Sequence, residues 1–204
     1  MLTFQDLFIF ICGFLIGSIP FGYIFSKLKG IDIRKVGSGN IGATNVTRVL
    51  GIKIGAIVAL LDVIKGLVFA LFISKIYAST DWKLFFLCFA PVLGHVFTPW
   101  LGFKGGKGVG TLTGVLIIIF NWQTLLFALV VWIILLYMTK IMSLTNLILS
   151  VILPILFLLN FHNLISVFFG ILFGLFIFWT HRSNIKRLIA GKELKLNQKS
   201  KIKN

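Results

Sequence analysis

The stretch 109–138 reads VGTLTGVLIIIFNWQTLLFALVVWIILLYM, and it decides how many times this chain crosses a membrane. As one helix, its thirty residues would extend about 45 Å at 1.5 Å per residue, whereas the hydrocarbon core of a bilayer is about 30 Å thick. Asn121 and Trp122 interrupt the apolar run near its middle, and a polar residue beside a tryptophan is typical of a membrane interface. The stretch is therefore either one overlong span or two short ones.

The composition of the chain establishes the membrane setting. The 204 residues are 58% hydrophobic and 12% charged, with a mean hydropathy of +1.05, which excludes a soluble globular domain. In so apolar a chain, a cytoplasmic bias of basic residues explains the net charge of +15, and we expect no nucleic-acid partner. Cys12 and Cys88 lie inside apolar runs without metal-ligand spacing, so we expect neither a disulfide nor a zinc site.

The basic residues choose between one span and two. Seventeen of the twenty Lys and Arg residues fall in four stretches, which are 27–53, 104–107, Lys140 and 182–203. A single span over 109–138 would place the last two stretches opposite the first, against the tendency of basic residues to remain cytoplasmic. Two spans, about 109–120 and 122–138, keep all four stretches on one face.

We therefore predict an all-α integral membrane protein with seven transmembrane helices, some short or broken. Its N-terminus lies outside and its C-terminus in the cytoplasm. The whole chain, 1–204, forms one membrane-embedded domain, and 196–204 forms a mobile basic tail. Prolines at 20, 91 and 154 should kink their helices. The other five spans are predicted over 4–26, 54–75, 83–101, 143–160 and 163–180.

The first polar motif on the cationic face is GSGNIGATNVTR at 37–48. Its glycines, among them Gly37 and Gly39, let the backbone turn and present N–H groups to an anion. Arg48 adds a planar cation suited to phosphate. An ordinary connecting loop is the alternative, although it would rarely concentrate so many small polar residues. The neutral donors of the motif are Ser38, Asn40, Thr44 and Asn45.

The second motif is GFKGGKG at 102–108, directly before a predicted helix. Two lysines in a glycine-rich turn at a helix N-terminus make a suitable phosphate cradle, although the spacing is not that of a Walker A loop. The alternative is a flexible loop that is basic because it lies inside. The candidate residues are Lys104, Gly105, Gly106, Lys107 and Gly108.

Two further motifs lie where helices meet the cationic face. The run WTHRSNIKR at 179–187, followed by GKELK at 191–195, supplies His181, Arg182, Asn184, Glu193 and Lys195. A juxtamembrane basic anchor explains its cations but not its other polar residues. The run SLTN at 143–146, with Ser143, Thr145 and Asn146, reads on its own as a helix N-cap.

Three ionisable residues fall inside predicted spans. Asp62 and Lys65 are spaced to pair on one helix face, and a structural pair and a substrate contact are both open. His95 is expected to hydrogen-bond within the bundle, with a ligand role second. Carboxylates are too few for two-metal phosphoryl transfer. No metal site is therefore expected.

Five segments together resemble the bacterial PlsY family in order and spacing. They are GSIPFG at 17–22, GSGNIGATNVTR at 37–48, LDVIKG at 61–66, HVFTPWLGFKGGKGVGT at 95–111 and HRSNIKRLIAGKELK at 181–195. The resemblance implies an acyltransferase with seven helices. It would move a fatty acyl group from acyl phosphate to the 1-hydroxyl of sn-glycerol 3-phosphate, giving lysophosphatidic acid and phosphate. Neither acyl-CoA nor acyl carrier protein would be the donor, and no cofactor is expected.

The resemblance also implies a setting and a set of roles. The protein would act in the first acylation step of phospholipid synthesis, in the bacterial inner membrane with its site facing the cytoplasm, and in functional linkage with an enzyme that produces acyl phosphate. Where the family usually has a second serine after Ser143, this chain has Thr145-Asn146, which leaves the hydroxyl role there open. The remaining candidates would bind substrate or phosphate, and the implied catalytic residues are Ser38, Arg48, Lys107, Ser143, His181 and Asn184.

Two points stay open from the sequence. The proton of the attacking hydroxyl would pass either to His181 or to a substrate phosphate. A membrane transporter or binder of a small phosphorylated anion would also use cationic, glycine-rich loops. Against it, the sequence has no inverted repeat and no polar residues through most spans.

Overall fold

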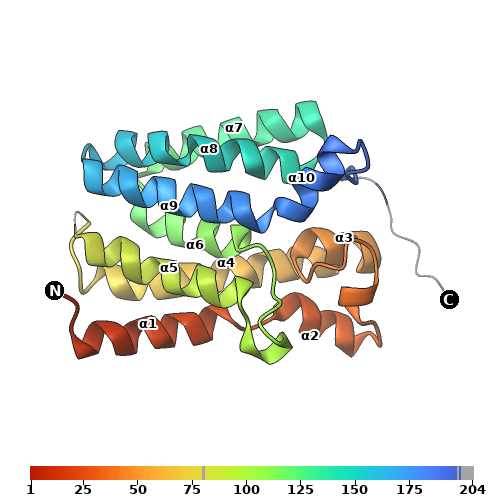
Figure 1. Ribbon diagram of the computed structural model, residues 1–204, viewed down its shortest axis with the longest axis horizontal. Coiled ribbons are helices and arrows are strands. Elements are labelled where there is room, and N and C mark those ends of the chain that lie inside the picture. Colours follow the sequence, from red (N-terminus) through yellow and green to blue (C-terminus); the bar gives the residue numbers. More distant parts are fainter. Residues whose placement is uncertain (80, 197, 199–204) are drawn as a thin grey trace.

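The computed structural model describes residues 1–79, 81–196 and 198, and all regular structure within them is helical, as predicted (Figure 1). The prediction of a mobile tail over 196–204 falls almost entirely outside the described residues. Two short 3₁₀ turns, Ile33–Lys35 and Pro99–Leu101, accompany ten α-helices among the described residues. The α-helices are α1 (Phe4–Gly17), α2 (Phe21–Leu28), α3 (Ala43–Leu50), α4 (Ile52–Ser74), α5 (Trp82–Val96), α6 (Val109–Ile119), α7 (Trp122–Thr139), α8 (Met142–Phe161), α9 (Leu164–Thr180) and α10 (Arg182–Ile189).

The helices are long and apolar enough for a multi-pass membrane protein. By length and composition, five segments among the described residues could cross a bilayer, and the first of them joins α1 and α2. The count becomes six if α9 and α10, which are bent by 60° at their junction, form one further span. The apolar helix α6 has only 11 residues. The membrane-spanning character is thus confirmed, while the count of seven stays a prediction.

The decisive stretch 109–138 is divided as the charge pattern predicted. Helix α6 ends at Ile119 and α7 begins at Trp122. Asn121 caps α7, because its side chain accepts a hydrogen bond from the Thr124 N–H at 2.9 Å. Its own N–H donates to the side chain of Asn160 on α8 at 2.7 Å. One residue therefore both starts a helix and fixes the turn against a neighbour.

Two predicted spans are confirmed as segments that could cross a bilayer, Phe4–Leu28 and Trp82–Leu101, but the helix within each is interrupted. The span expected over 4–26 divides into α1 and α2 at Ser18–Pro20, because Pro20 has no N–H to continue a helix. The side chains of Thr98 and Trp100 donate to the Ser18 carbonyl and hydroxyl oxygens at 2.7 and 2.8 Å, which holds the break in place. Within the span expected over 83–101, helix α5 ends at Val96. The span continues through Thr98, which caps the 3₁₀ turn Pro99–Leu101, and Trp100 lies in that turn.

Glycines bring the helices into backbone contact. A side chain at Gly17 of α1 would collide with the backbone of Pro91 on α5, and one at Gly174 of α9 would collide with the Ser150 carbonyl on α8. Gly66 of α4 faces the Thr111 carbonyl of α6 in the same way. Such small residues let membrane helices approach closely. An aromatic core that includes Phe85, Phe89, Phe157 and Phe173 fills the centre.

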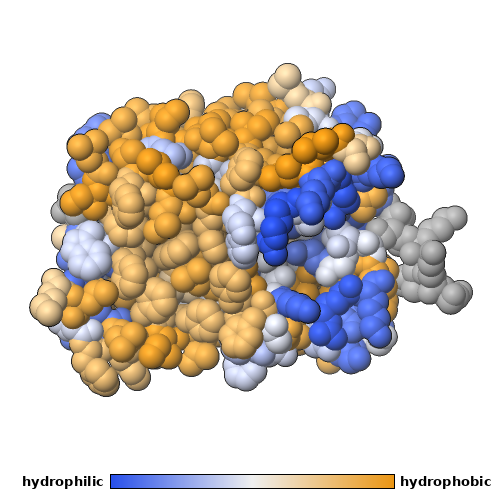
Figure 2. All heavy atoms as spheres, in the orientation of Figure 1, coloured by the Kyte–Doolittle hydropathy of each residue, from blue (hydrophilic) through white to orange (hydrophobic). Residues whose placement is uncertain are grey.

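Two short helices were not predicted, and both lie at the cationic end of the bundle. Helix α3 forms the second half of the 37–48 motif, with Val46 fully buried and Arg48 on its last turn. Helix α10 begins at Arg182, after the 60° bend. In Figure 2, hydrophilic residues gather at this end over α10 and around α2 and α3, while hydrophobic side chains cover most of the remaining visible surface.

Candidate active site

A cavity of about 570 Å³ opens at the cationic end of the bundle and reaches between α4, α6, α7 and α8. Its polar part is formed by α3, the 102–108 loop, the start of α8 and the α9–α10 junction. Farther along α6, its wall becomes apolar. Twelve of the twenty predicted site residues line it: Ser38, Asn40, Thr44, Asn45, Arg48, Lys107, Gly108, Ser143, Asn146, His181, Asn184 and Glu193.

Eight predicted site residues do not line the cavity. Gly37 and Gly39 shape the first loop with positive φ angles of 64° and 72°, a conformation that favours glycine. Thr145 is fully buried, and its hydroxyl donates to the Ile141 carbonyl at 3.2 Å. The other five are Lys104, Gly105, Gly106, Arg182 and Lys195. A direct substrate role for these eight stays a prediction.

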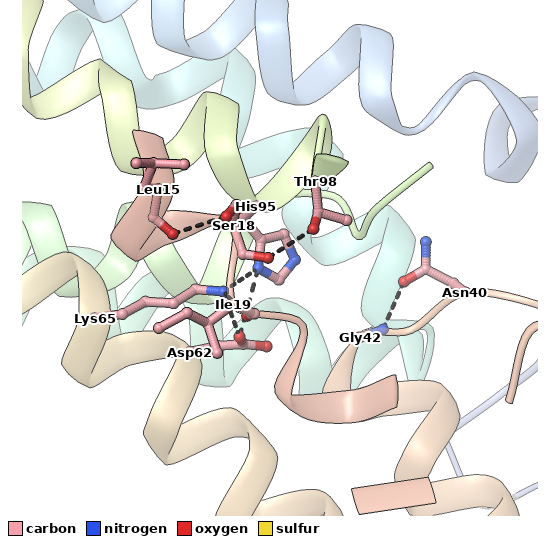
Figure 3. A network of polar contacts seen from close by, with 9 residues as sticks. All are labelled: Leu15, Ser18, Ile19, Asn40, Gly42, Asp62, Lys65, His95 and Thr98. Carbon is pink, nitrogen blue, oxygen red and sulfur yellow. Dashed lines mark hydrogen bonds and ion pairs between the residues drawn. The ribbon is translucent and has the colours of Figure 1, made fainter. Parts of the chain in front are cut away.

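The first loop is built around the buried side chain of Asn45. Its Oδ1 accepts from the Ser38 N–H at 2.9 Å, and its Nδ2 donates to the carbonyls of Val36 and Asn40 at 3.0 and 2.9 Å. The Asn40 side chain in turn accepts from the Gly42 N–H at 2.8 Å (Figure 3). Asn45 therefore uses its amide to shape the loop, while the Ser38 hydroxyl remains beside the cavity.

Two cations on the cavity wall lack a carboxylate partner within the described part of the chain. The Arg48 Nη2 donates to the Leu194 carbonyl at 3.0 Å, but its buried Nε has no hydrogen-bond partner there. Lys107 forms no ion pair with the described carboxylates. Burial lowers the pKa of Lys107 to about 8, and the nearby Arg187 and Arg48 add to this against the opposing effect of Glu193. Desolvated cations facing a cavity favour the binding of an anion.

Glu193 collects several of the predicted residues into one network. The Ser143 hydroxyl and the Asn184 amide donate to its Oε1 at 2.8 and 2.6 Å, and Arg187 Nε donates to its Oε2 at 2.7 Å. Burial alone would raise the pKa of Glu193, but these hydrogen bonds hold it below its usual value. Glu193 thereby joins α8, α10 and the C-terminal segment. Sequence reasoning identified these residues but not the ion pair with Arg187.

His181 stands between α9 and α10 with its ring buried against the cavity. Its Nδ1 is 2.8 Å from the Ile177 carbonyl oxygen, which can only accept, so Nδ1 carries the proton and Nε2 keeps a lone pair. Burial, with Lys107 nearby, lowers the pKa of His181 to about 4. The ring is therefore neutral near pH 7 and presents an acceptor.

The second loop meets the site at the N-terminus of α6. Gly108 has a positive φ of 83° and caps the helix without a side-chain hydrogen bond. The Thr180 hydroxyl donates to the Lys107 carbonyl at 3.1 Å and thereby joins the loop to the end of α9. The first N–H groups of a helix have no partner within it. At this position they border the cavity and add to its affinity for anions.

Sequence reasoning did not place two groups of cavity residues in the site. Asp62 and His95 line it; their sequence signal, ionisable groups within apolar spans, had left a substrate contact open for Asp62 and a ligand role second for His95. The apolar wall includes Leu116, Phe120 and Leu156. These three residues carry no signal of their own, because nothing separates them in sequence from ordinary core positions.

Comparison with known proteins shows the family of the chain. The sequence profile described as Glycerol-3-phosphate acyltransferase matches residues 7–191. The chain belongs to this family. The resemblance that the five sequence segments indicated is thereby confirmed. The matched range of the glycerol-3-phosphate acyltransferase family includes both glycine-rich loops, Ser143, His181 and Asn184, whereas Glu193 and Lys195 lie just beyond it.

Relatives within the family match nearly the whole chain. The glycerol-3-phosphate acyltransferase of Aquifex aeolicus (strain VF5) is 43% identical over 190 residues, covering 93% of this chain and 98% of the relative. That of Desulforamulus reducens (strain ATCC BAA-1160 / DSM 100696 / MI-1) is 42% identical over 200 residues, covering 98% and 99%.

Solved structures of the family share the fold. The crystal structure of PlsY, an integral membrane glycerol 3-phosphate acyltransferase in its glycerol 3-phosphate form, has a TM-score of 0.87 at 41% identity, over 94% of this chain and 95% of that chain. Its lysophosphatidic acid form has a TM-score of 0.85 at 39% identity, over 95% and 96%. At this identity, the likeness extends beyond the fold to the family.

Proposed function

We propose that this protein transfers a fatty acyl group from acyl phosphate to the 1-hydroxyl of sn-glycerol 3-phosphate, giving lysophosphatidic acid and phosphate. Family membership and the solved relatives with glycerol 3-phosphate and lysophosphatidic acid support the acceptor and the product. The donor is the one that the resemblance to the PlsY family implies, and the residues of the site are consistent with it. Acyl phosphate carries its own phosphate leaving group, so the site need not supply a covalent nucleophile.

One observation carries the proposal: two uncompensated cations share a cavity that continues into an apolar wall. Arg48 and Lys107 line its polar part, and Leu116 and Phe120 line the apolar part. Acyl phosphate is arranged in the same way, because its charged phosphate is joined through a carbonyl group to an apolar acyl chain. Bringing two phosphate-bearing substrates together requires more than one cation, because their negative charges repel each other.

The proposed reaction is a direct displacement at the acyl carbon. The 1-hydroxyl oxygen attacks the carbonyl carbon and forms the ester bond. The bond from that carbon to the phosphate oxygen breaks, and phosphate leaves with the electron pair. Arg48 and Lys107 hold the phosphate groups, while Ser38 and Asn184 stabilise charge that develops on the carbonyl oxygen. Ser143 and Glu193 position Asn184 through the network around Oε1.

The hydroxyl proton goes to phosphate in this scheme, and His181 orients the hydroxyl. The pKa of His181 is about 4, whereas a phosphate monoester loses its second proton with a pKa of about 6. The phosphate dianion is therefore the stronger base, and the neutral ring presents Nε2 as a hydrogen-bond acceptor. His181→Ala should then reduce the rate without shifting its acid limb. If the wild type has an acid limb near pH 4 in its pH–rate profile and His181→Ala loses it, His181 would instead be the base.

The membrane arrangement follows from the charge distribution. We propose seven passes with α6 as a short one, the N-terminus outside and the C-terminus in the cytoplasm. The polar end seen in Figure 2 carries α3 and α10, and it would face the cytoplasm because basic residues are retained there. The site would then face the cytoplasm from the bacterial inner membrane. An enzyme that produces acyl phosphate would supply the donor at the same face.

The first test is acyl transfer by the purified full chain in detergent or lipid mesophase. Glycerol 3-phosphate would be supplied with either palmitoyl phosphate or palmitoyl-CoA, and phosphate and lysophosphatidic acid would be followed. Turnover with acyl phosphate alone is expected. Turnover with palmitoyl-CoA would overturn the proposed donor. A folded protein that binds glycerol 3-phosphate without turnover would favour the alternative of a transporter or binder.

A further inference from the structure

A buried cluster at the edge of the cavity remains outside the roles assigned so far. Asp62 and Lys65 on α4 are each 4% exposed, and His95 on the last turn of α5 is 5% exposed. Asp62 and His95 both border the cavity. Burying an ion pair costs several kcal/mol per ion in desolvation and is weak evidence for added stability. A function beside the substrate is therefore the better explanation.

The geometry of the cluster fixes where its protons lie (Figure 3). The Lys65 ammonium is 2.8 Å from His95 Nδ1, 2.9 Å from Asp62 Oδ1 and 3.0 Å from the Ile19 carbonyl oxygen. Nδ1 of His95 also lies 3.4 Å from Asp62 Oδ1, but its shorter contact is to the ammonium group, which has three donors and no acceptor, so Nδ1 accepts. The imidazole is then neutral and carries its proton on Nε2. Lys65 thus selects the tautomer of His95.

The Nε2–H of His95 points to the second glycine-rich loop. A side chain at Gly106 would collide with Nε2, and the Gly106 N–H donates to the His95 carbonyl at 3.0 Å. The loop therefore lies directly against the ring. Within the described part of the chain, Nε2–H has no acceptor. His95 borders the cavity, so an acceptor on a ligand could take this unused donor.

We propose that His95 is a further substrate-contacting residue, whose Nε2–H donates a hydrogen bond to a phosphate oxygen held at the 102–108 loop. Lys65 and Asp62 are positioning residues that keep the proton on Nε2. This role rests on the proposed function, because it assigns a contact within the same site. The phosphate belongs either to glycerol 3-phosphate or to acyl phosphate. Arg48 and Lys107 attract the phosphate by their charge, and the hydrogen bond from a neutral donor orients it.

The test uses two variants of His95 in the full chain. His95→Gln keeps an N–H at the end of the side chain, whereas His95→Phe keeps the ring shape without the donor. Calorimetry would measure the binding of glycerol 3-phosphate and of a non-hydrolysable acyl phosphonate, and kcat and KM would be measured alongside. His162→Asn, at the start of the α8–α9 turn away from the cavity, is the matched control.

His95→Phe should weaken the binding of one probe about 10- to 100-fold, as expected for a lost hydrogen bond to a charged group, and His95→Gln should restore most of it. The probe that is weakened identifies the phosphate. The proposal is overturned if folded His95→Phe binds both probes like the wild type. It is also overturned if His95→Gln is as impaired as His95→Phe, since the ring would then act only by packing. The calorimetric result stands whether or not the wild type transfers acyl groups.

Discussion

The two ends of the helix bundle use charge in opposite ways. At the end without the cavity, Asp6 accepts from the Thr3 N–H at 2.7 Å and from Lys83 Nζ at 3.0 Å, and the Tyr77 hydroxyl donates to it as well. At the cavity end, Arg48 and Lys107 have no carboxylate partner in the described residues.

The charged groups at the first end stabilise the fold, whereas those at the cavity end are compensated only when a ligand binds. A buried carboxylate with several donors is compensated in the unliganded protein. A desolvated cation without a partner destabilises that state, and a bound anion offsets the cost. The functional site is therefore expected at the end where cations have no carboxylate partner among the described residues of the unliganded protein.

The largest expected effect comes from removing a cation that has no carboxylate partner in the described part of the chain. Lys107→Met should lower kcat/KM about 10²- to 10³-fold, the range measured when one preorganised electrostatic group is lost from an active site. The same variant should raise the unfolding midpoint, because a desolvated ammonium disappears from the unliganded protein. Turnover and thermal unfolding in one detergent would measure both effects.

Lys83→Met is the matched control at the opposite end. It removes a paired cation, so its unfolding midpoint should fall while kcat/KM stays within a factor of two. Equal loss of activity in both variants would mean that the two ends do not differ in the way described.

The next effect concerns Glu193, the carboxylate that joins Ser143, Asn184 and Arg187 at the cavity end. Glu193→Gln removes the charge that Arg187 pairs with, and because its NH₂ group cannot accept, the amide cannot serve Arg187 at one end and both Ser143 and Asn184 at the other. We expect kcat to fall about 10- to 100-fold with a smaller change in KM, since Asn184 loses its orientation. Steady-state kinetics would check this, and a change in KM alone would contradict a positioning role.

Most of the fold could be predicted from local sequence signals. The break at Asn121 followed from helix length and charge, and it was correct because a polar cap and a basic bias act independently of tertiary contacts. The break at Pro20 was expected from the proline, whereas the end of α5 at Val96 was missed. Both depend on side chains from a distant segment that hold the break at Ser18.

The polar part of the site was predictable, whereas the rest required the fold. Twelve predicted residues line the cavity because glycine-rich and basic motifs reflect anion binding directly. Helix α3 was missed because its apolar residues serve a small local cluster around Val46. Phe120 and Leu156 carry no local signal, and the tautomer of His95 depends on Lys65 from another helix.

The pH dependence of kcat/KM is a finer test of the role of the Lys107 ammonium. Lys107 binds anions only when protonated, and its pKa is about 8 in the unliganded protein. Raising the pH above 8 removes that proton, so kcat/KM for glycerol 3-phosphate should fall about tenfold per pH unit, because this parameter reports the free enzyme. Lys107→Arg should move the fall beyond the measurable range, since arginine stays charged. An unchanged alkaline limb in Lys107→Arg would assign it to another group.

The smallest effect is expected at the end without the cavity, where the charge of Asp6 is compensated. Tyr77→Phe removes one of the donors to Asp6 and leaves Thr3 and Lys83 in place. The carboxylate keeps most of its compensation, so the unfolding midpoint should fall by only about 2–4 °C, the shift that a chain of this size shows for a single modest interaction. Activity should not change, because this cluster and the cavity share no residue. Thermal unfolding and turnover of the same preparation would check both statements. A fall in kcat without a fall in midpoint would show that the two ends communicate, and the division between structural and ligand-binding charge would then have to be abandoned.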